Sequence, residues 1–361
     1  MEKERWKSWR AGLRSVLSAA LAMSVVMTGG LMAVRRLDTG ETAPAFAESG
    51  NGARPMLVPM GQAIGIKLFS DGVLVVGLSP IETEQGALCP GRACGLKEGD
   101  VITGVNGRQV DTIEEVQRAV AADSGGELTI RAMRGKKSLQ LTAAPVQNKE
   151  GEYQLGVWLR DSMAGIGTMT FYDPESGAFG ALGHGVNDVD TSILMPMESG
   201  AIMAAEVSGV ERGVSGTPGA LQGDFDMSGD LGTLRANTPQ GVFGTIGSKT
   251  FAQGREQLPA AKPSEVRTGE AFILSNIRGK QVERFSVEIT KINPDSDGDR
   301  NLMLRVTDPR LLEATGGIVQ GMSGSPILQN GKLIGAVTHV LINSPEKGYG
   351  IFIENMLEAA E

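Results

Sequence analysis

A glycine-flanked serine just before two short apolar runs limits the folds open to this chain of 361 residues more than any other feature. Glycines on both sides of Ser323 and the proline at position 326 allow the backbone to turn sharply and then stop. Residues 326–328 and 333–340 are apolar and β-prone, and the Asn330-Gly331 pair between them is the strongest short-range hairpin signal in a sequence. We therefore predict a serine presented on a loop directly before a β-hairpin.

This order of loop and strands excludes one serine-enzyme fold and resembles another. An α/β-hydrolase nucleophile needs Gly-x-Ser-x-Gly running from a strand into a helix, whereas here Ser325 replaces the second glycine and a strand follows. The run Gly321-Met322-Ser323-Gly324 is instead similar to the Gly-Asp-Ser-Gly of chymotrypsin-like proteases. That resemblance implies a β-barrel fold, with Ser323 as nucleophile and the backbone N–H groups of Gly321 and Ser323 as the oxyanion hole.

The composition favours β structure in more than one domain. A length of 361 residues allows two domains, and 41% hydrophobic residues is enough for real cores. The chain has 50 glycines but only 4% aromatic residues. Abundant glycine without a repeat, together with many short β-prone runs, indicates turn-rich β structure rather than a helical bundle.

The N-terminal segment has the pattern of a signal anchor. Residues 15–34 carry no charge and are mostly apolar, so their 20 positions match the ~20 residues of a transmembrane helix. Five basic residues within 1–14 keep that tail on the synthesising side of the membrane, and the remainder is exported after a linker over 35–59. The Ala45-Phe46-Ala47 run resembles a cleavage site but lies well beyond the apolar run. A signal anchor is therefore favoured over a cleaved signal peptide, and the sequence leaves open whether the chain is released later.

The exported part is acidic. Without residues 1–36 it has 27 basic and 40 acidic residues, a net charge of −13, which argues against nucleic-acid binding. Its two cysteines, Cys89 and Cys94, are close enough in sequence for a disulfide, which the spacing alone does not prove. Only His184 and His339 remain as further soft ligands, and neither has zinc-ligand spacing. We predict no metal and no cofactor.

Residues 60–147 are predicted to form a small α+β binding domain. Short strands and tight turns surround one candidate helix at 113–121. The run from Ala93 to Ile102 resembles the Ala-x-x-Ala-Gly-Leu-x-x-Gly-Asp-x-Ile signature of protease-associated PDZ domains. By this resemblance the carboxylate-binding loop is Ile64, Gly65 and Ile66, and the C-terminus of a partner peptide adds as a strand alongside it.

Residues 152–361 are the expected serine peptidase domain. A β-prone segment delivers His184 between two glycines, which suits a general base because the imidazole must be held and yet be reachable. His339 is the competing base. It lies on the second strand of the predicted hairpin, so we expect it to be a wall or packing residue.

A third group must orient the histidine and stabilise its charged form. Asp308 is favoured because it follows an alternating strand over residues 302–306, which fixes the side chain at a strand end. Asp188 and Asp190 are the rivals, since they are near His184 along the chain. A further acidic group is predicted to be a solvated hairpin turn (Asp295, Asp297 and Asp299).

Taken in order, the anchor, the PDZ segment, Gly-His-Gly and Gly-Met-Ser-Gly-Ser-Pro resemble the SpoIVB serine peptidase family of endospore-forming bacteria. The particular motifs are residues 181–185, 306–309 and 316–326, and the likeness runs from the anchor to the C-terminus. The resemblance implies His184 as the base, Asp308 as the orienting residue and Ser323 as the nucleophile.

The family resemblance also implies a biological role. Such a peptidase is exported into the space between the forespore and mother-cell membranes. There it cleaves a membrane-bound inhibitor of an intramembrane protease, which then processes a sporulation sigma factor. We also expect self-cleavage in the linker, because a tethered protease meets its own flexible segment at high effective concentration. The alternative is a membrane-tethered PDZ scaffold whose protease-like domain is inert, but the presence of all three triad residue types favours the enzyme.

Overall fold

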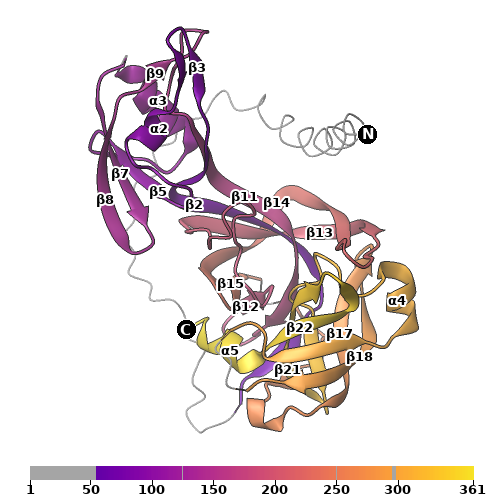
Figure 1. Cartoon of the computed structure of the whole chain (residues 1–361). Helices are drawn as coiled ribbons and strands as arrows, with labels where there is room; N and C mark the ends of the chain where they lie inside the picture. Colours follow the sequence, from indigo (N-terminus) through magenta and orange to yellow (C-terminus); the bar gives the residue numbers. More distant parts are fainter. Residues whose placement is uncertain (1–53, 124, 249, 295–297) are drawn as a thin grey trace, which may run out of the picture. The chain divides into compact units, whose positions relative to one another are not determined.

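The computed structural model describes residues 54–361 except 124, 249 and 295–297, and it is mainly β, as predicted (Figure 1). The expected tail, the expected anchor at 15–34 and most of the expected linker lie outside these residues. In the part of the chain that is described, no helix is long and apolar enough to cross a membrane.

Six strands close into a first antiparallel barrel in the order β2-β11-β12-β15-β14-β13. The ring closes because β2 pairs with β13 along one edge and with β11 along the other. Inward-facing apolar side chains fill it, among them Ile64, Met169, Phe179 and Ile202. The bounds are β2 Ala63–Leu78, β11 Val157–Tyr172, β12 Ala178–Ala181, β13 Ser199–Glu211, β14 Ala220–Thr238 and β15 Gly241–Thr245.

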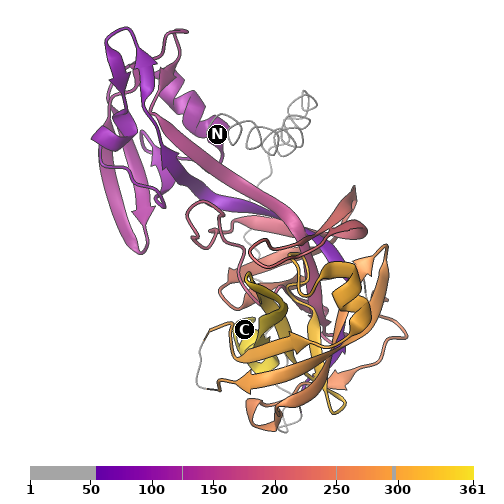
Figure 2. The same cartoon turned by 45° about the vertical axis from the view of Figure 1, so that its right-hand side comes forward.

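A second closed barrel, the orange and yellow part of Figure 2, has the order β17-β18-β19-β22-β21-β20. Its core includes Ile273, Phe285, Leu304 and Val337. Two six-stranded antiparallel barrels in one chain confirm the expected protease-like β-barrel fold. The bounds are β17 Gly269–Arg278, β18 Gln281–Ile292, β19 Leu302–Val306, β20 Pro326–Gln329, β21 Lys332–Leu341 and β22 Ser344–Phe352.

The predicted hairpin after the serine loop is confirmed. Strands β20 and β21 pair from Pro326↔Ala336 to Gln329↔Lys332. Asn330 and Gly331 at the turn have φ angles of 50° and 72°, and positive values at both positions define the type I′ turn that suits two-residue hairpins.

The predicted PDZ domain is an insertion between two strands of the first barrel. The outer half of β2 pairs with β5, and the sheet continues through β7 and β8. Helix α3 begins with a capping box between Thr112 and Glu115 and buries Val116 and Val120 against this sheet. The chain returns to the barrel through β11. The bounds are β5 Val101–Val105, α3 Ile113–Ala122, β7 Leu128–Arg134 and β8 Lys137–Ala143.

Short elements complete the described chain, and Cys89 and Cys94 on either side of helix α2 are free thiols. Strand β1 connects the chain to the first barrel by pairing with β11 and β16. The remaining bounds are β1 Met56–Pro59, β3 Ile81–Thr83, β4 Gly86–Leu88, α2 Pro90–Ala93, β6 Arg108–Gln109, β9 Val146–Gln147, β10 Tyr153–Gln154, β16 Leu258–Pro259, η1 Pro263–Glu265, α4 Pro309–Thr315 and α5 Ile353–Glu358.

Candidate active site

Ser323 lies on the loop between α4 and β20, and the glycines predicted to shape this loop are required there. Gly321 and Gly324 both have a φ of 95°, in the left-handed region that favours glycine. A Cβ added to Gly324 would lie 2.0 Å from the carbonyl oxygen of Thr168 in β11. The serine loop of the second barrel therefore packs closely against a strand of the first.

His184 follows strand β12 of the first barrel in the predicted Gly-His-Gly loop. Its Nδ1 lies 2.8 Å from the carbonyl oxygen of Gly185. A carbonyl oxygen only accepts, so Nδ1 carries the proton and the lone pair stays on Nε2. Burial lowers the pKa of His184 below 6.5, which keeps the imidazole neutral at neutral pH. The side chain therefore has the protonation state and the tautomer of a general base.

His184 and Ser323 line the same cavity, which has a volume of about 620 Å³. Apolar side chains from both barrels form most of its wall, including Ile66, Met163 and Ile318. Among the described residues that line it, none is Asp, Glu, Lys or Arg. The cavity is therefore suited to uncharged peptide segments.

Two backbone N–H groups of the serine loop are available as oxyanion donors. The Gln320 carbonyl accepts from Leu221 N at 2.8 Å and the Met322 carbonyl accepts from Ser325 N at 3.0 Å. In a trans peptide the N–H points opposite to the carbonyl, so the N–H groups of Gly321 and Ser323 point away from those partners. Within the described chain neither donates to a protein acceptor. Both predicted oxyanion residues line the cavity.

The Ser323 hydroxyl donates to the carbonyl oxygen of Thr338 at 2.7 Å, and the described residues include no hydrogen bond between Ser323 and His184. The pair shares one cavity, and the Ser323 hydroxyl must leave the Thr338 carbonyl before it can donate to His184. Such loose geometry is common in catalytic sites without substrate.

The structure does not place Asp308 as the orienting residue, which corrects the prediction. Asp308 is the N-cap of α4, where it accepts from the backbone N–H of Arg310 at 3.0 Å and of Ser286 at 3.3 Å. The Arg310 guanidinium binds both carboxylate oxygens and holds the pKa of Asp308 below its usual range. The position at a strand end was predicted correctly, but that end serves a helix start and an ion pair.

The rival carboxylates do not orient His184 either. Asp188 is fully buried and binds Arg160 of β11, which also pairs with Asp190 at 2.8 Å. These ion pairs hold the loop that follows the base. The Nδ1–H of His184 instead donates a hydrogen bond to the backbone carbonyl oxygen of Gly185.

His339 lies in the cavity wall, as predicted, and it brings an unexpected carboxylate with it. The rings of His184 and His339 are 5.0 Å apart between centroids. Asp299 Oδ2 lies 3.5 Å from His339 Nδ1. Asp299 was predicted to belong to a solvated turn, and no local pattern indicates that the β18–β19 connection reaches the site.

The predicted carboxylate-binding loop at Ile64, Gly65 and Ile66 is wrong. These residues lie inside β2, where Gly65 pairs with Ile166 on one side and with Met203 on the other. Both edges of the strand are occupied, and Ile64 and Ile66 are buried in the barrel. No backbone remains there to receive a peptide.

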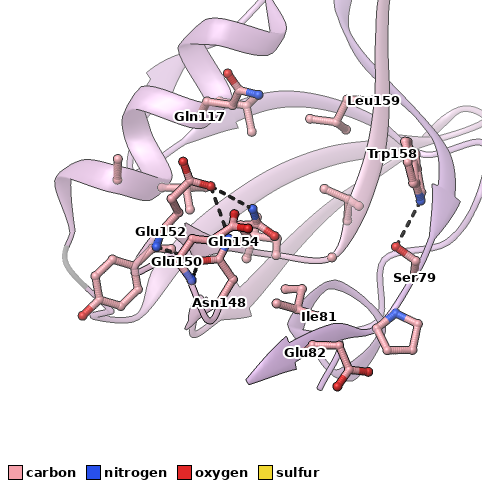
Figure 3. A pocket seen from close by; sticks show the side chains of 18 of the residues that line it. Ser79, Ile81, Glu82, Gln117, Asn148, Glu150, Glu152, Gln154, Trp158 and Leu159 are labelled. Atoms are coloured by element: carbon pink, nitrogen blue, oxygen red, sulfur yellow. Dashed lines mark hydrogen bonds between the residues drawn. The ribbon is translucent and has the colours of Figure 1, made fainter. Parts of the chain in front are cut away.

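The inserted domain has a different groove, and Figure 3 shows side chains that line it. Backbone N–H groups that could bind a peptide carboxylate lie beside this groove. It has a volume of about 1040 Å³ and lies between helix α3 and the segment that enters β11. The carbonyls of Leu155 and Gly156 accept from Gly91 N at 2.7 Å and Ser79 N at 3.0 Å. The N–H groups of Gly156 and Val157 therefore point the opposite way.

The entering segment of β11 also has a free edge. From Val157 to Gly167 this strand pairs with β2 alone in the described chain. Trp158 is 64% exposed beside the groove, with its indole N–H donating to Ser79 Oγ at 3.0 Å (Figure 3). The sequence signal for this site is the Leu155-Gly156-Val157 run before a long β-prone segment, where Gly156 has a φ of 71°.

Two protein-family models match this chain, one over the peptidase region and one over the inserted domain. A family model described as SpoIVB peptidase S55 matches residues 151–357, and a PDZ domain model matches residues 84–134. No curated protein sequence matches.

Solved structures similar to this chain include proteases and a PDZ domain. The Rv3671c protease from M. tuberculosis in its active form is 16% identical, with a TM-score of 0.32, covering 68% of this chain and 83% of that chain. A variant of the HtrA-type protease AlgW with a decapeptide is 14% identical, with a TM-score of 0.34 and coverage of 56% and 51%. The PDZ domain of an SdrC-like protein from Listeria monocytogenes is 24% identical, with a TM-score of 0.20 and coverage of 25% and 87%.

Proposed function

Because the chain belongs to the SpoIVB peptidase S55 family and is a serine endopeptidase with a PDZ domain, we propose that Ser323 and His184 are its catalytic pair. The observation that supports this assignment is that one cavity holds both side chains together with the Gly321 and Ser323 N–H groups.

The chemistry follows from the positions of these groups. Ser323 Oγ attacks the peptide carbonyl while His184 Nε2 takes the hydroxyl proton, and the tetrahedral oxyanion accepts from the N–H groups of Gly321 and Ser323. The C–N bond then breaks as the imidazolium gives its proton to the leaving amine, which leaves an acyl-enzyme. Water repeats the sequence and releases the acid. The carbonyl of Gly185 holds Nδ1–H throughout and so fixes the ring.

We assign substrates that are extended segments with small or apolar side chains, because no Asp, Glu, Lys or Arg is among the described residues that line the cavity. The proposed biological role is that of an exported, membrane-anchored peptidase of sporulation. It cleaves itself and a membrane-bound regulator, which starts intramembrane proteolysis and sigma-factor activation. Support for the location comes from the uncharged run at 15–34 and from the family.

Self-cleavage is the most direct test of that role. The expected cut lies in the linker before strand β1, since β1 itself is paired and largely buried. N-terminal sequencing of protein released from membranes should give starts between residue 35 and Met56, and the Ser323→Ala chain should stay attached. Release of the Ser323→Ala chain at the same positions would assign the cut to another protease.

We assign the groove between α3 and β11 as the site for peptide C-termini. The carboxylate would accept from the N–H groups of Gly156 and Val157, and the peptide would add as a strand to the free edge of β11. A short peptide ending in valine should shift the fluorescence of Trp158, and the same peptide with a C-terminal amide should bind at least tenfold more weakly. The Trp158→Phe chain controls for the source of the signal. Equal binding of acid and amide would contradict the assignment.

A further inference from the structure

Thr168 of β11 forms hydrogen bonds to Gly321, to Ser323 and to the segment that leads to His184. It is buried, with 1% of its surface exposed. Its hydroxyl donates to the carbonyl oxygen of Gly321 at 2.7 Å, and its backbone N–H donates to the carbonyl oxygen of Ser323 at 3.0 Å. Its own carbonyl accepts from Leu182 N at 3.2 Å, two residues before His184. One residue of the first barrel thus contacts both oxyanion residues and the segment that carries the base.

The hydroxyl bond acts on Gly321, a conformationally permissive residue of the serine loop. Gly321 has no Cβ and a φ of 95°, so its two flanking peptide planes can rotate at little steric cost. The plane before Gly321 is held by the Gln320–Leu221 bond, and the plane after it is held by Thr168 Oγ1 and by the Met322–Val319 bond at 3.1 Å. The first contact fixes the direction of the Gly321 N–H. The other two fix the Gly321–Met322 plane, which lies between the planes that carry the Gly321 and Ser323 N–H groups and so sets how these two donors are oriented relative to each other.

We propose that Thr168 is a positioning residue that keeps the oxyanion hole preorganised through its hydroxyl. Its two backbone bonds do not involve the side chain, so Thr168→Val and Thr168→Ser test the side-chain bond to Gly321 alone. The inference rests on the proposed roles of Ser323 and Gly321. Preorganised donors act mainly on the transition state, so the loss should fall on kcat rather than on KM.

The same strand provides a matched control. Thr170 is two residues further along β11 and is fully buried, and its hydroxyl has no hydrogen-bond partner in the described structure. Thr168→Val and Thr170→Val are therefore the same chemical change at two buried sites of one strand. Only Thr168→Val removes a hydroxyl that donates a hydrogen bond in the described structure.

The experiment compares the full-length chain with Thr168→Val, Thr168→Ser and Thr170→Val, using p-nitrophenyl acetate as the probe. Stoichiometric labelling with a fluorophosphonate counts competent serines, so that kcat is expressed per active site. We expect Thr168→Val to lower kcat about 10- to 100-fold with KM nearly unchanged, somewhat less than complete removal of an oxyanion donor. Thr168→Ser should recover most of kcat, and Thr170→Val should match the parent chain.

Three results would overturn the inference. The first is a Thr168→Val kcat per active site equal to that of Thr170→Val. The second is a Thr168→Ser chain as slow as Thr168→Val, since the hydroxyl would then be irrelevant. The third is a loss confined to the number of labelled sites, which would indicate misfolding alone. Failure of the proposed catalytic pair would look different, because Ser323→Ala would then turn over the ester as fast as the parent chain.

Discussion

Replacement of Ser323 by alanine is expected to abolish peptide hydrolysis, with a loss on the order of 10⁶ in kcat on the serine-protease template. The substitution removes a single oxygen that lines the cavity and donates to the Thr338 carbonyl. No core contact is lost, so thermal unfolding should stay close to that of the parent chain. Turnover of a fluorogenic peptide and an unfolding curve measure both parts of the prediction.

Ser325→Ala is the control for this experiment. Ser325 is fully buried, its hydroxyl donates to Ser275 Oγ at 3.1 Å, and it does not line the cavity. Its removal should cost about 1 kcal/mol of stability and little activity. An inactive Ser325→Ala chain beside an active Ser323→Ala chain would move the nucleophile to the second serine of the motif.

His184→Gln is expected to be the second large loss, again on the order of 10⁶ in kcat, because glutamine cannot take the serine proton. In the parent chain the pH profile of kcat/KM should carry the same information. Burial lowers the pKa of His184 below its ordinary value, so activity should be fully present at neutral pH and fall only as the pH drops through the lowered pKa. An acidic limb well above pH 7 would contradict this role for His184.

Two variants separate His184 from the other candidates. Asp308→Asn should keep kcat within about threefold, because asparagine also caps helices, whereas an orienting carboxylate would cost ~10⁴. His339→Gln should alter KM more than kcat, since His339 lines the wall and has no hydrogen bond to Ser323 in the described structure. A collapse in the Asp308→Asn chain with its fold intact would restore Asp308 to the triad.

The parts of the site that were predictable from sequence depend on local backbone demands. Gly321 and Gly324 adopt positive φ, and Asn330-Gly331 makes the turn that its residue types favour. A histidine between two glycines also carries its own loop signal. These features need only a few neighbouring residues, so the sequence predicts them well.

The predictions that the structure does not support concern features that depend on contacts between residues distant in sequence. An apolar segment such as Ile64-Gly65-Ile66 suits a peptide-binding loop and a barrel strand equally well, and only the pairing with β11 and β13 decides between them. The insertion of the PDZ domain between β2 and β11 was missed for the same reason, since it becomes visible only when these two strands are seen to pair. The orienting role predicted for Asp308 rested on its position at a strand end. A carboxylate in that position can equally cap the next helix, as Asp308 does for α4.

In the proposed mechanism Ser323 is the nucleophile, and His184 activates it. Labelling of the full-length chain with a fluorophosphonate, followed by mass spectrometry of the peptides, tests this claim most directly. We predict one adduct, on Ser323, whose rate of formation falls at least 10³-fold in the His184→Gln chain and changes little in the Asp308→Asn chain. An adduct on another residue, or labelling of Ser323 at the same rate without His184, would contradict it.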